Sequence, residues 1–388
     1  MLLGIDSFLA RPPRELLEKR WGLLSNQASV NSDGYYSKDL LRGKFENNLI
    51  RLFSPQHGFW GTEQDNMIET PDGRDPATDL PLFSLYGRTR RPTMQMLEGI
   101  DILLIDLQDV GTRVYTFITT LAFCLQEAKD QGKTVVVLDR PNPIGGTQVE
   151  GNILRTNMTS YVGVHALPMR HGMTIGELGG FFNKEMEIGA DLQVIRLEGW
   201  NRSHYWDQTG LQFMIPSPNM PTLSTALVYP GQVLWEGTNV SEGRGTTRPF
   251  EFFGAPFINS REVQDFLKNI SLPGAHLLET TFRPTFQKFQ GEECRGFFLW
   301  VQDRLAFKPY FTTLALLQAV LTIYKEAFQW KAPPYEYETE KTPIDILIGD
   351  REIRTALEGG TPVTDLEQFW EAGLEEFLDK RRNYLLYP

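Results

Sequence analysis

Cysteine and metal-ligand patterns are scarce in this chain. Its 388 residues include two cysteines, Cys124 and Cys294, and neither belongs to a CxxC or Cys/His spacing. Isolated thiols cannot build a disulfide framework, and zinc sites need several closely spaced ligands. The five histidines show no ligand spacing, and HExxH does not occur. We therefore expect buried thiols, no bound metal and no cofactor.

Long apolar runs and clustered positive charge are also missing. No stretch reaches the ~18 apolar residues of a membrane-spanning helix, and the N-terminus has no basic segment followed by an apolar one. The formal net charge is -11, whereas proteins that bind nucleic acid or anionic membranes carry clustered Lys and Arg. We expect a cytoplasmic protein that binds a small molecule, not nucleic acid or a membrane.

Short apolar runs alternate with amphipathic segments. Between the third and fourth runs, apolar residues recur at helical spacing from Phe117 to Ala128, which predicts a helix that ends near Gly132. Nearly continuous apolar runs are typical of parallel strands buried on both faces, so the pattern predicts a doubly wound α/β domain. The five predicted strands lie at 21–29, 49–54, 100–109, 134–143 and 192–197.

Polar segments rich in Gly and Pro follow several of these strands. Ligands of open parallel sheets bind beyond the carboxyl ends of the strands, so we expect these side chains to converge on one edge. No GxGxxG follows the first strand, and neither GxxxxGKS/T nor GxSxG occurs. Carboxylates with Arg, Asn and aromatics are the residues of a sugar site. The converging set is His57, Asp106, Asp109, Arg113, Tyr115, Asp139, Arg140, Asn142 and, after the fifth strand, Asn219.

A second polar cluster occupies residues 234–251, among glycines and threonines. Glycines let the backbone approach a ligand, and arginines bind carboxylate or phosphate with two hydrogen bonds. An acidic sugar is one ligand that uses both. The alternative is a surface loop in which acidic and basic side chains pair with each other. The charged residues are Glu236, Glu242, Arg244, Arg248 and Glu251.

Single residues of these motifs also have structural interpretations. Glu177 stands three residues after Thr174 and before an apolar run, which predicts a capping box and not catalysis. Glu150 follows a glycine pair and is either a loop charge or an active-site carboxylate. His57 precedes Gly58, which favours an exposed position over a core histidine. The two prolines of residues 140–143 are also compatible with a rigid turn.

Ten motifs extend over essentially the whole chain. They are SPQHGFWG, SLYG, IDLQDVGTRVYTF, LDRPNPIGG, VEG, RHGMTIGEL, PSPNMPT, YPG, EGTNVSEGRGTTRPFE and RRNYLLYP. In order and spacing they resemble the NamZ exo-β-N-acetylmuramidase family of glycoside hydrolases. The resemblance implies a Rossmann-like catalytic domain (1–225), a smaller C-terminal α/β domain (226–388) and a cleft between them. It also implies release of terminal β-linked N-acetylmuramic acid from peptidoglycan fragments. Many relatives are exported, whereas this chain starts at the family's GIDSFL, so we expect cytoplasmic recycling of imported fragments.

The resemblance also implies roles for individual residues. Glycosidases of this kind place two carboxylates at the scissile bond. We expect Glu242 and Glu150 in these roles, with Asp109 third and His57 as an orienting or proton-relaying group. N-acetylmuramic acid carries a lactyl carboxylate, for which Arg113, Arg140, Arg244 and Arg248 are the candidate partners. Further expected substrate-binding residues are Gln56, Asp106, Tyr115, Asn142 and Asn219.

Gln56 departs from the family pattern. Relatives commonly carry glutamate there, and an amide cannot serve as a general acid, a base or a nucleophile. The chain has therefore either lost the activity or moved the role, for which Glu63, Asp65 and Glu69 are candidates. The first case predicts a non-catalytic binder of muropeptides or acidic sugars. A further alternative is a metal-dependent phosphoesterase that uses Asp106, Asp109 and Asp139.

Overall fold

The five N-terminal apolar runs, together with two further short strands, form one seven-stranded sheet. The computed structural model describes residues 1–388, and its strand order is β3-β4-β2-β1-β5-β6-β7. All neighbours are parallel except β3 and β4, which confirms the predicted parallel sheet. The strands are β1 (Trp21–Ser25), β2 (Leu49–Ser54), β3 (Gly73–Arg74), β4 (Pro81–Ser84), β5 (Ile102–Asp106), β6 (Thr134–Leu138) and β7 (Asp191–Ile195).

Helices cover both faces of this sheet, as doubly wound folds require. Successive side chains of a strand point to opposite faces. Accordingly, Leu104 belongs to the apolar cluster that contains Phe8, whereas Ile105 belongs to the one that contains Leu121. The first cluster also includes side chains of α1 (Gly4–Ala10) and α2 (Ser37–Lys44). The second includes side chains of α3 (Met94–Leu97), α4 (Phe117–Asp130) and α5 (Ile175–Glu185).

The strand order changes direction between β1 and β5. The chain passes from β1 to β2 and β4 on one side, and then returns to β5, β6 and β7 on the other. In such sheets the crevice at this reversal, beyond the carboxyl ends of the strands, is the usual ligand site. Several strands end earlier than predicted, at Ser25, Asp106 and Leu138, and the following polar segments are loops.

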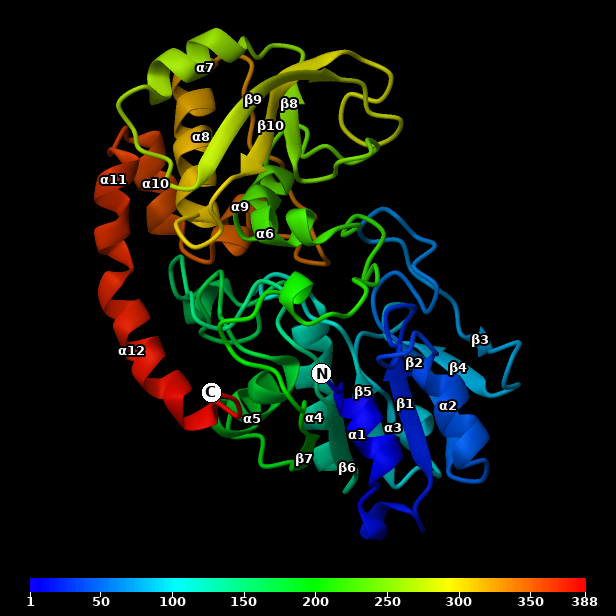
Figure 1. Cartoon of the computed structure of the whole chain (residues 1–388). Helices are drawn as coiled ribbons and strands as arrows, with labels where there is room; N and C mark the ends of the chain where they lie inside the picture. The colour runs from blue at the N-terminus through cyan, green and yellow to red at the C-terminus, as the bar shows by residue number, and fades with distance from the viewer.

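A smaller antiparallel sheet lies in the C-terminal part, in the upper half of Figure 1. Its order is β8-β10-β9, with β8 (Phe252–Ala255), β9 (Ala275–Phe282) and β10 (Cys294–Val301). The apolar segment that begins near residue 310 forms α8, which ends at Ile323. The helices are α6 (Leu223–Gln232), α7 (Ser260–Leu267), α8 (Pro309–Ile323), α9 (Pro343–Ile348), α10 (Arg351–Glu358), α11 (Val363–Leu366) and α12 (Glu371–Arg381).

The end of the chain returns to the N-terminal sheet. Helix α12 runs from the upper half of Figure 1 down to α5. There the Leu386 N–H donates to Glu177 (2.8 Å), and the Arg202 N–H donates to the Pro388 carbonyl (2.8 Å). Glu177 also forms the predicted capping box with Thr174. The predicted boundary between residues 225 and 226 lies within α6, and the division into two domains stays a prediction.

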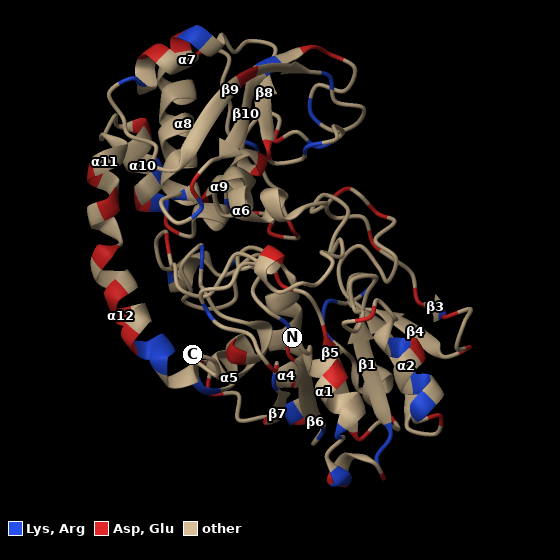
Figure 2. Cartoon of the chain, viewed as in Figure 1, with Lys and Arg blue, Asp and Glu red and all other residues tan.

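Charged residues of both signs are spread along the folded chain. In Figure 2, acidic and basic segments are interspersed over both halves of the molecule in this view. No helix combines the length and the apolar character that crossing a bilayer requires.

Candidate active site

A buried pocket lies where the loops after β2 and β5 meet the C-terminal part of the chain. The β2 loop contributes Gln56, His57 and Asn66, and the β5 loop contributes Tyr115. The C-terminal part contributes two carboxylates. The polar lining is Gln56, His57, Asn66, Tyr115, Thr116, Ser217, Asn219, Tyr229, Glu236, Arg244, Tyr335 and Glu336.

Glu336 sits at the tip of a tight turn that delivers its carboxylate to this pocket. Tyr335 and Glu338 exchange backbone hydrogen bonds of 2.9 and 3.0 Å, so Glu336 and Tyr337 form a two-residue hairpin loop. Both loop residues have positive φ, 46° and 66°, as type I′ turns require. Neither is glycine, so the turn is strained. The Arg90 guanidinium packs on the Tyr337 ring, 3.3 Å from its centroid, and holds the turn against the N-terminal part.

Backbone strain is concentrated around the pocket. Non-glycine residues with positive φ cost about 1–3 kcal/mol each and cluster at functional sites. Three lining residues, His57, Phe250 and Glu336, have φ values of 70°, 63° and 46°. Met67, whose sulfur accepts from the Glu336 N–H, has a φ of 63°. The fold therefore maintains unfavourable backbone conformations to shape this site.

Gln56 and Tyr86 position the Glu336 carboxylate. The Gln56 amide donates to one oxygen (3.0 Å), and the Tyr86 hydroxyl donates to the other (2.7 Å). Burial of the side chain disfavours its charged form, and the nearby Glu236 carboxylate adds to this effect. Together they raise the pKa of Glu336 to about 7, although the hydrogen bond from Tyr86 works in the opposite direction. Glu336 is thus a carboxyl group able to hold a proton near neutral pH.

Glu236 is the ionised partner. It lies on the short 3₁₀ segment Val233–Gly237, and its carboxylate accepts from Arg244 (2.6 Å), Asn66 (2.9 Å) and the Tyr335 hydroxyl. Burial opposes ionisation, but the Arg244 charge and the Tyr335 hydrogen bond outweigh it and lower the pKa of Glu236. The two pocket carboxylates, Glu236 and Glu336, therefore have pKa values shifted in opposite directions. That separation is the arrangement of an acid and a base.

Glu242 lies behind the pocket and not in its lining. Its carboxylate pairs with Lys288 (2.7 Å) and with Arg244 (3.2 Å). The Lys288 ammonium is fixed in turn by the carbonyls of Trp235 and Val240. Glu242 therefore orients the Arg244 side chain toward Glu236, and its catalytic role stays a prediction.

A segment without helix or strand, residues 62–68, covers the pocket, and we call it the strap. The strap carbonyl of Gln64 accepts from Asn219 (2.8 Å) and Arg244 (3.2 Å). His57 Nδ1 lies 2.6 Å from the Glu63 carbonyl, and burial lowers the pKa of His57 to about 4. The imidazole is therefore neutral, with Nδ1 as the donor and Nε2 free to accept a proton.

The three acidic residues considered as substitutes for the family glutamate do not line the pocket. Glu63 contacts His57 only through its backbone carbonyl. Asp65 accepts from Gln287, and Glu69 pairs with Arg90 at the surface (3.1 Å). The carboxyl group that contacts Gln56 is Glu336, which comes from the other end of the chain.

Glu150 and Asp109, which the sequence made catalytic candidates, are placed elsewhere. The Glu150 carboxylate accepts from the N–H groups of Tyr310 (3.2 Å) and Phe311 (2.8 Å), so it caps the N-terminus of α8. Asp109 accepts from the Gly111 N–H (2.7 Å) and lies 3.3 Å from a ring nitrogen of His171. Both carboxylates are buried among structural partners and neither lines the pocket.

Removal of the Glu150 carboxylate should lower the free energy of unfolding and leave turnover unchanged. Glu150→Ala leaves N–H groups of α8 without an acceptor, so we expect a loss of about 1–2 kcal/mol in unfolding free energy. Denaturant unfolding measures this loss, with the exposed Glu46→Ala as the matched control. A large fall in turnover by folded Glu150→Ala protein would return Glu150 to the catalytic candidates.

Most of the predicted substrate-binding arginines have protein partners. The Arg113 guanidinium donates to four backbone carbonyls, of residues 152, 167, 347 and 348. Arg140 pairs with Asp106 in the core, and Arg248 pairs with Glu251 (3.1 Å) outside the pocket. Of the four candidates for the lactyl carboxylate, only Arg244 lines the pocket.

Asn142 and the sheet-edge aspartates also have structural partners. The Asn142 side chain accepts from the Ile144 N–H (3.1 Å) and donates to the Met173 carbonyl (3.0 Å), which stabilises the predicted turn. Asp139 accepts from the Gly176 N–H (2.8 Å) and from Thr174 (2.8 Å). The three aspartates required for the phosphoesterase alternative thus have separate partners, and no cluster of three or more His, Cys, Asp or Glu side chains is arranged to hold a metal.

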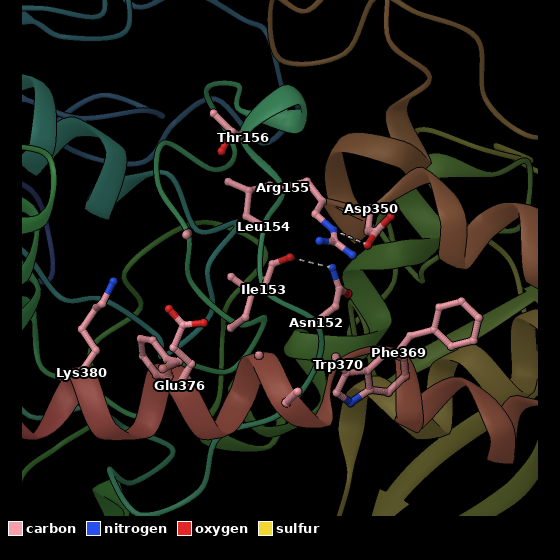
Figure 3. Close-up of a pocket in the computed structure, with 14 residues that line it drawn as sticks. Asn152, Ile153, Leu154, Arg155, Thr156, Asp350, Phe369, Trp370, Glu376 and Lys380 are labelled. Atoms are coloured by element: carbon pink, nitrogen blue, oxygen red, sulfur yellow. Dashed lines mark hydrogen bonds and ion pairs between the residues drawn. The ribbon is translucent and has the colours of Figure 1, made fainter.

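A second cavity shares no lining residue with the pocket of the paired carboxylates. It is bounded by α12 and by the segment 152–156, and Figure 3 shows Ile153 on that segment and Trp370 near the start of the helix. Two charged side chains of its lining, Arg155 and Asp350, form an ion pair (2.8 Å). Asp350 also accepts from the Glu352 N–H (2.9 Å), so this carboxylate caps α10 and has structural partners.

Comparisons with known proteins extend over the whole chain. The family model described as Exo-beta-N-acetylmuramidase NamZ, N-terminal matches residues 21–224, and its C-terminal counterpart matches residues 227–387. The chain belongs to the NamZ family. It is 44% identical over 384 residues to the peptidoglycan beta-N-acetylmuramidase NamZ of Bacillus subtilis (strain 168), which covers 99% of this chain and 91% of that protein.

Solved structures agree with membership of the NamZ family. A DUF1343 family protein from Bacteroides fragilis NCTC 9343 superposes with a TM-score of 0.89 at 29% identity, covering 100% of this chain and 99% of that chain. A second DUF1343 family protein from the same organism has a TM-score of 0.78 at 26% identity, covering 100% of this chain and 98% of that chain. The predicted α/β architecture and the family resemblance are confirmed.

Proposed function

We propose that this NamZ family member is an exo-acting glycoside hydrolase that releases terminal β-linked N-acetylmuramic acid from peptidoglycan fragments. The observation that carries the proposal is the carboxylate pair in one buried pocket, with the Glu336 pKa raised and the Glu236 pKa lowered. The Bacillus subtilis relative is a peptidoglycan beta-N-acetylmuramidase, which supports the same reaction. Cytoplasmic recycling of imported wall fragments is part of the proposal.

Glu336 is the proposed general acid. Glycoside hydrolysis needs a proton on the leaving oxygen and a second carboxylate at the anomeric carbon, as nucleophile or as the base that activates water. A carboxyl group with a pKa near 7 is protonated in a useful fraction at neutral pH and still transfers its proton readily. The ionised Glu236 takes the second role. Tyr335 and Arg244 keep that carboxylate charged until it acts.

The departure at Gln56 is compatible with this mechanism. Its amide donates to Glu336 (3.0 Å), and its carbonyl oxygen accepts from Thr116. Gln56 therefore orients the acid instead of acting as one. The role that the family glutamate was expected to supply is moved to a residue 280 positions away along the chain.

Substrate entry requires the strap to move. The interior of the pocket is about 40 Å³, close to the size of one water molecule, and a sugar ring is several times larger. Asn66 and the Gln64 carbonyl, which close the pocket, are held only by hydrogen bonds from or to polar side chains. Sugar hydroxyls could replace these hydrogen bonds when the strap moves, and the substrate would then enter the pocket.

The pH dependence should show both carboxylates. Because Glu336 must be protonated to act as the acid, kcat/KM should fall about tenfold per pH unit above its pKa of about 7. Because the pKa of Glu236 is lowered from 4.5, the acidic limb should lie below pH 4.5. A pH profile of kcat/KM between pH 3 and 9 checks both limbs. If the alkaline limb persists unchanged in Glu336→Gln, the pKa of about 7 in the profile belongs to another group.

Release of 4-nitrophenol tests the function directly. We expect the protein to hydrolyse 4-nitrophenyl β-N-acetylmuraminide in the presence of a chelator and to leave the corresponding N-acetylglucosaminide intact. No release from either sugar, together with binding of muropeptides, would establish the non-catalytic binder instead. Release that a chelator abolishes would favour metal-dependent chemistry.

A further inference from the structure

A broad groove borders the candidate active-site pocket. Its volume is about 770 Å³, and it shares Asn219 with the pocket. The strap separates the two spaces, because Gln64 lines the groove and Asn66 lines the pocket. Displacement of the strap would therefore join the closed pocket to the open groove.

Aromatic side chains form the wall of this groove. The rings of Phe252 and Phe282 stack with centroids 5.7 Å apart, and Phe286 lies beside them in the lining. The segment that carries Phe286 is fixed, since the Thr285 N–H donates to the Gly245 carbonyl (2.9 Å). A Cβ at position 245 would lie 2.8 Å from the Phe286 backbone nitrogen, so this close packing requires the glycine.

Arg283 is the one charged side chain in the lining of the groove. It is exposed and takes part in no ion pair, unlike Arg244 and Arg248 on neighbouring segments. In a chain with a net charge of -11, an uncompensated guanidinium beside the pocket favours an anionic ligand there. Flat apolar rings with a free guanidinium suit a sugar chain that carries a carboxylate.

We propose that the groove binds the leaving side of the glycan: Phe286 packs against the first sugar beyond the scissile bond, and Arg283 pairs with a carboxylate farther along. This inference rests on the proposed function. An exo-acting enzyme encloses one terminal sugar, and the rest of the chain must emerge from the mouth of that site. The groove is the space into which the pocket opens once the strap moves.

Three substrates of increasing length test the groove. They are 4-nitrophenyl β-N-acetylmuraminide, the disaccharide N-acetylmuramyl-β-(1,4)-N-acetylglucosamine, and the tetrasaccharide with a second muramic acid. Phe286→Leu should raise KM for the disaccharide and the tetrasaccharide by about threefold to tenfold, because a stacking face is lost. Arg283→Ala should raise KM about threefold or more for the tetrasaccharide alone. Arg283→Ala should keep wild-type rates on the nitrophenyl substrate, whose leaving group is too short to reach Arg283. Both variants should keep wild-type kcat, and circular dichroism shows that they are folded.

The control and the outcomes separate this inference from the proposed function. Arg295→Ala, an exposed arginine on β10 outside the groove, should match the wild type on all three substrates. Wild-type protein that hydrolyses none of them contradicts the proposed function. Wild-type protein that hydrolyses all three, with both groove variants unchanged on the tetrasaccharide, contradicts the groove assignment and leaves the proposed function standing.

Discussion

Glu336→Gln should lower kcat/KM on the muramyl disaccharide by about 10²-fold to 10⁴-fold, the range that a general acid contributes. The amide has almost the same shape as the carboxyl group and keeps a hydrogen-bonding group beside Gln56 and Tyr86. It cannot deliver a proton to a sugar leaving group, whose oxygen needs one. The loss should therefore be chemical, with little change in unfolding temperature.

Glu340→Gln is the matched control for this substitution. Glu340 follows Glu336 by four residues, is exposed, and lies outside the pocket. It should retain wild-type kcat/KM. Comparable losses in the two variants would point to disruption of the loop and not to removal of an acid. Wild-type activity in Glu336→Gln would end the assignment.

Glu236→Gln should lower kcat/KM by at least about 10²-fold on every muraminide, whatever the leaving group. The second carboxylate acts at the anomeric carbon, so a better leaving group cannot compensate for its removal. The substitution also removes the anion that pairs with Arg244 (2.6 Å), and the Arg244 charge then faces only Glu242. Circular dichroism and thermal melting separate the chemical loss from this change in charge balance.

Glu242→Gln provides the comparison for Glu236→Gln. It removes the other carboxylate that pairs with Arg244 (3.2 Å), yet it lies outside the pocket lining. We expect a smaller loss, because Glu242 acts through the orientation of Arg244. Equal losses in the two variants would mean that Arg244 and not Glu236 limits the reaction. A larger loss in Glu242→Gln would restore the role that the sequence suggested for it.

The strands of the sheet are predictable because each one depends on a short run of neighbouring apolar residues. The run 49–54 coincides with β2, since buried parallel strands require nearly continuous apolar residues. The capping box of Glu177 follows from a fixed spacing of three residues and is present as expected. Loops were harder: the strands end at Ser25, Asp106 and Leu138, earlier than the apolar runs alone indicate.

The site was only partly predictable because its chemistry depends on contacts between distant segments. Gln56, His57, Tyr115, Asn219 and Arg244 were named from motifs and do line the pocket. Residue type was misleading for arginine, since the motifs cannot show whether a guanidinium faces a ligand or a set of backbone carbonyls.

Glu336 carries no signal that a single sequence could reveal. It lies in the acidic stretch YEYETE, which matches no catalytic motif. Its importance comes from a hydrogen bond to Gln56 and from a strained turn, both of which are tertiary features. Glu236 belongs to the polar cluster that the motifs indicate, but the sequence does not show which of Glu236 and Glu242 faces the pocket.

The ratio of kcat/KM on two substrates tests the central claim most directly. Nitrophenol leaves readily without protonation, whereas a sugar alkoxide does not, so loss of a general acid should depend on the leaving group. In Glu336→Gln, we predict a fall of about 10²-fold or more on the muramyl disaccharide and a much smaller fall on 4-nitrophenyl β-N-acetylmuraminide. Equal falls on both substrates, or no fall on the disaccharide, would contradict the assignment of Glu336 as the acid of this enzyme.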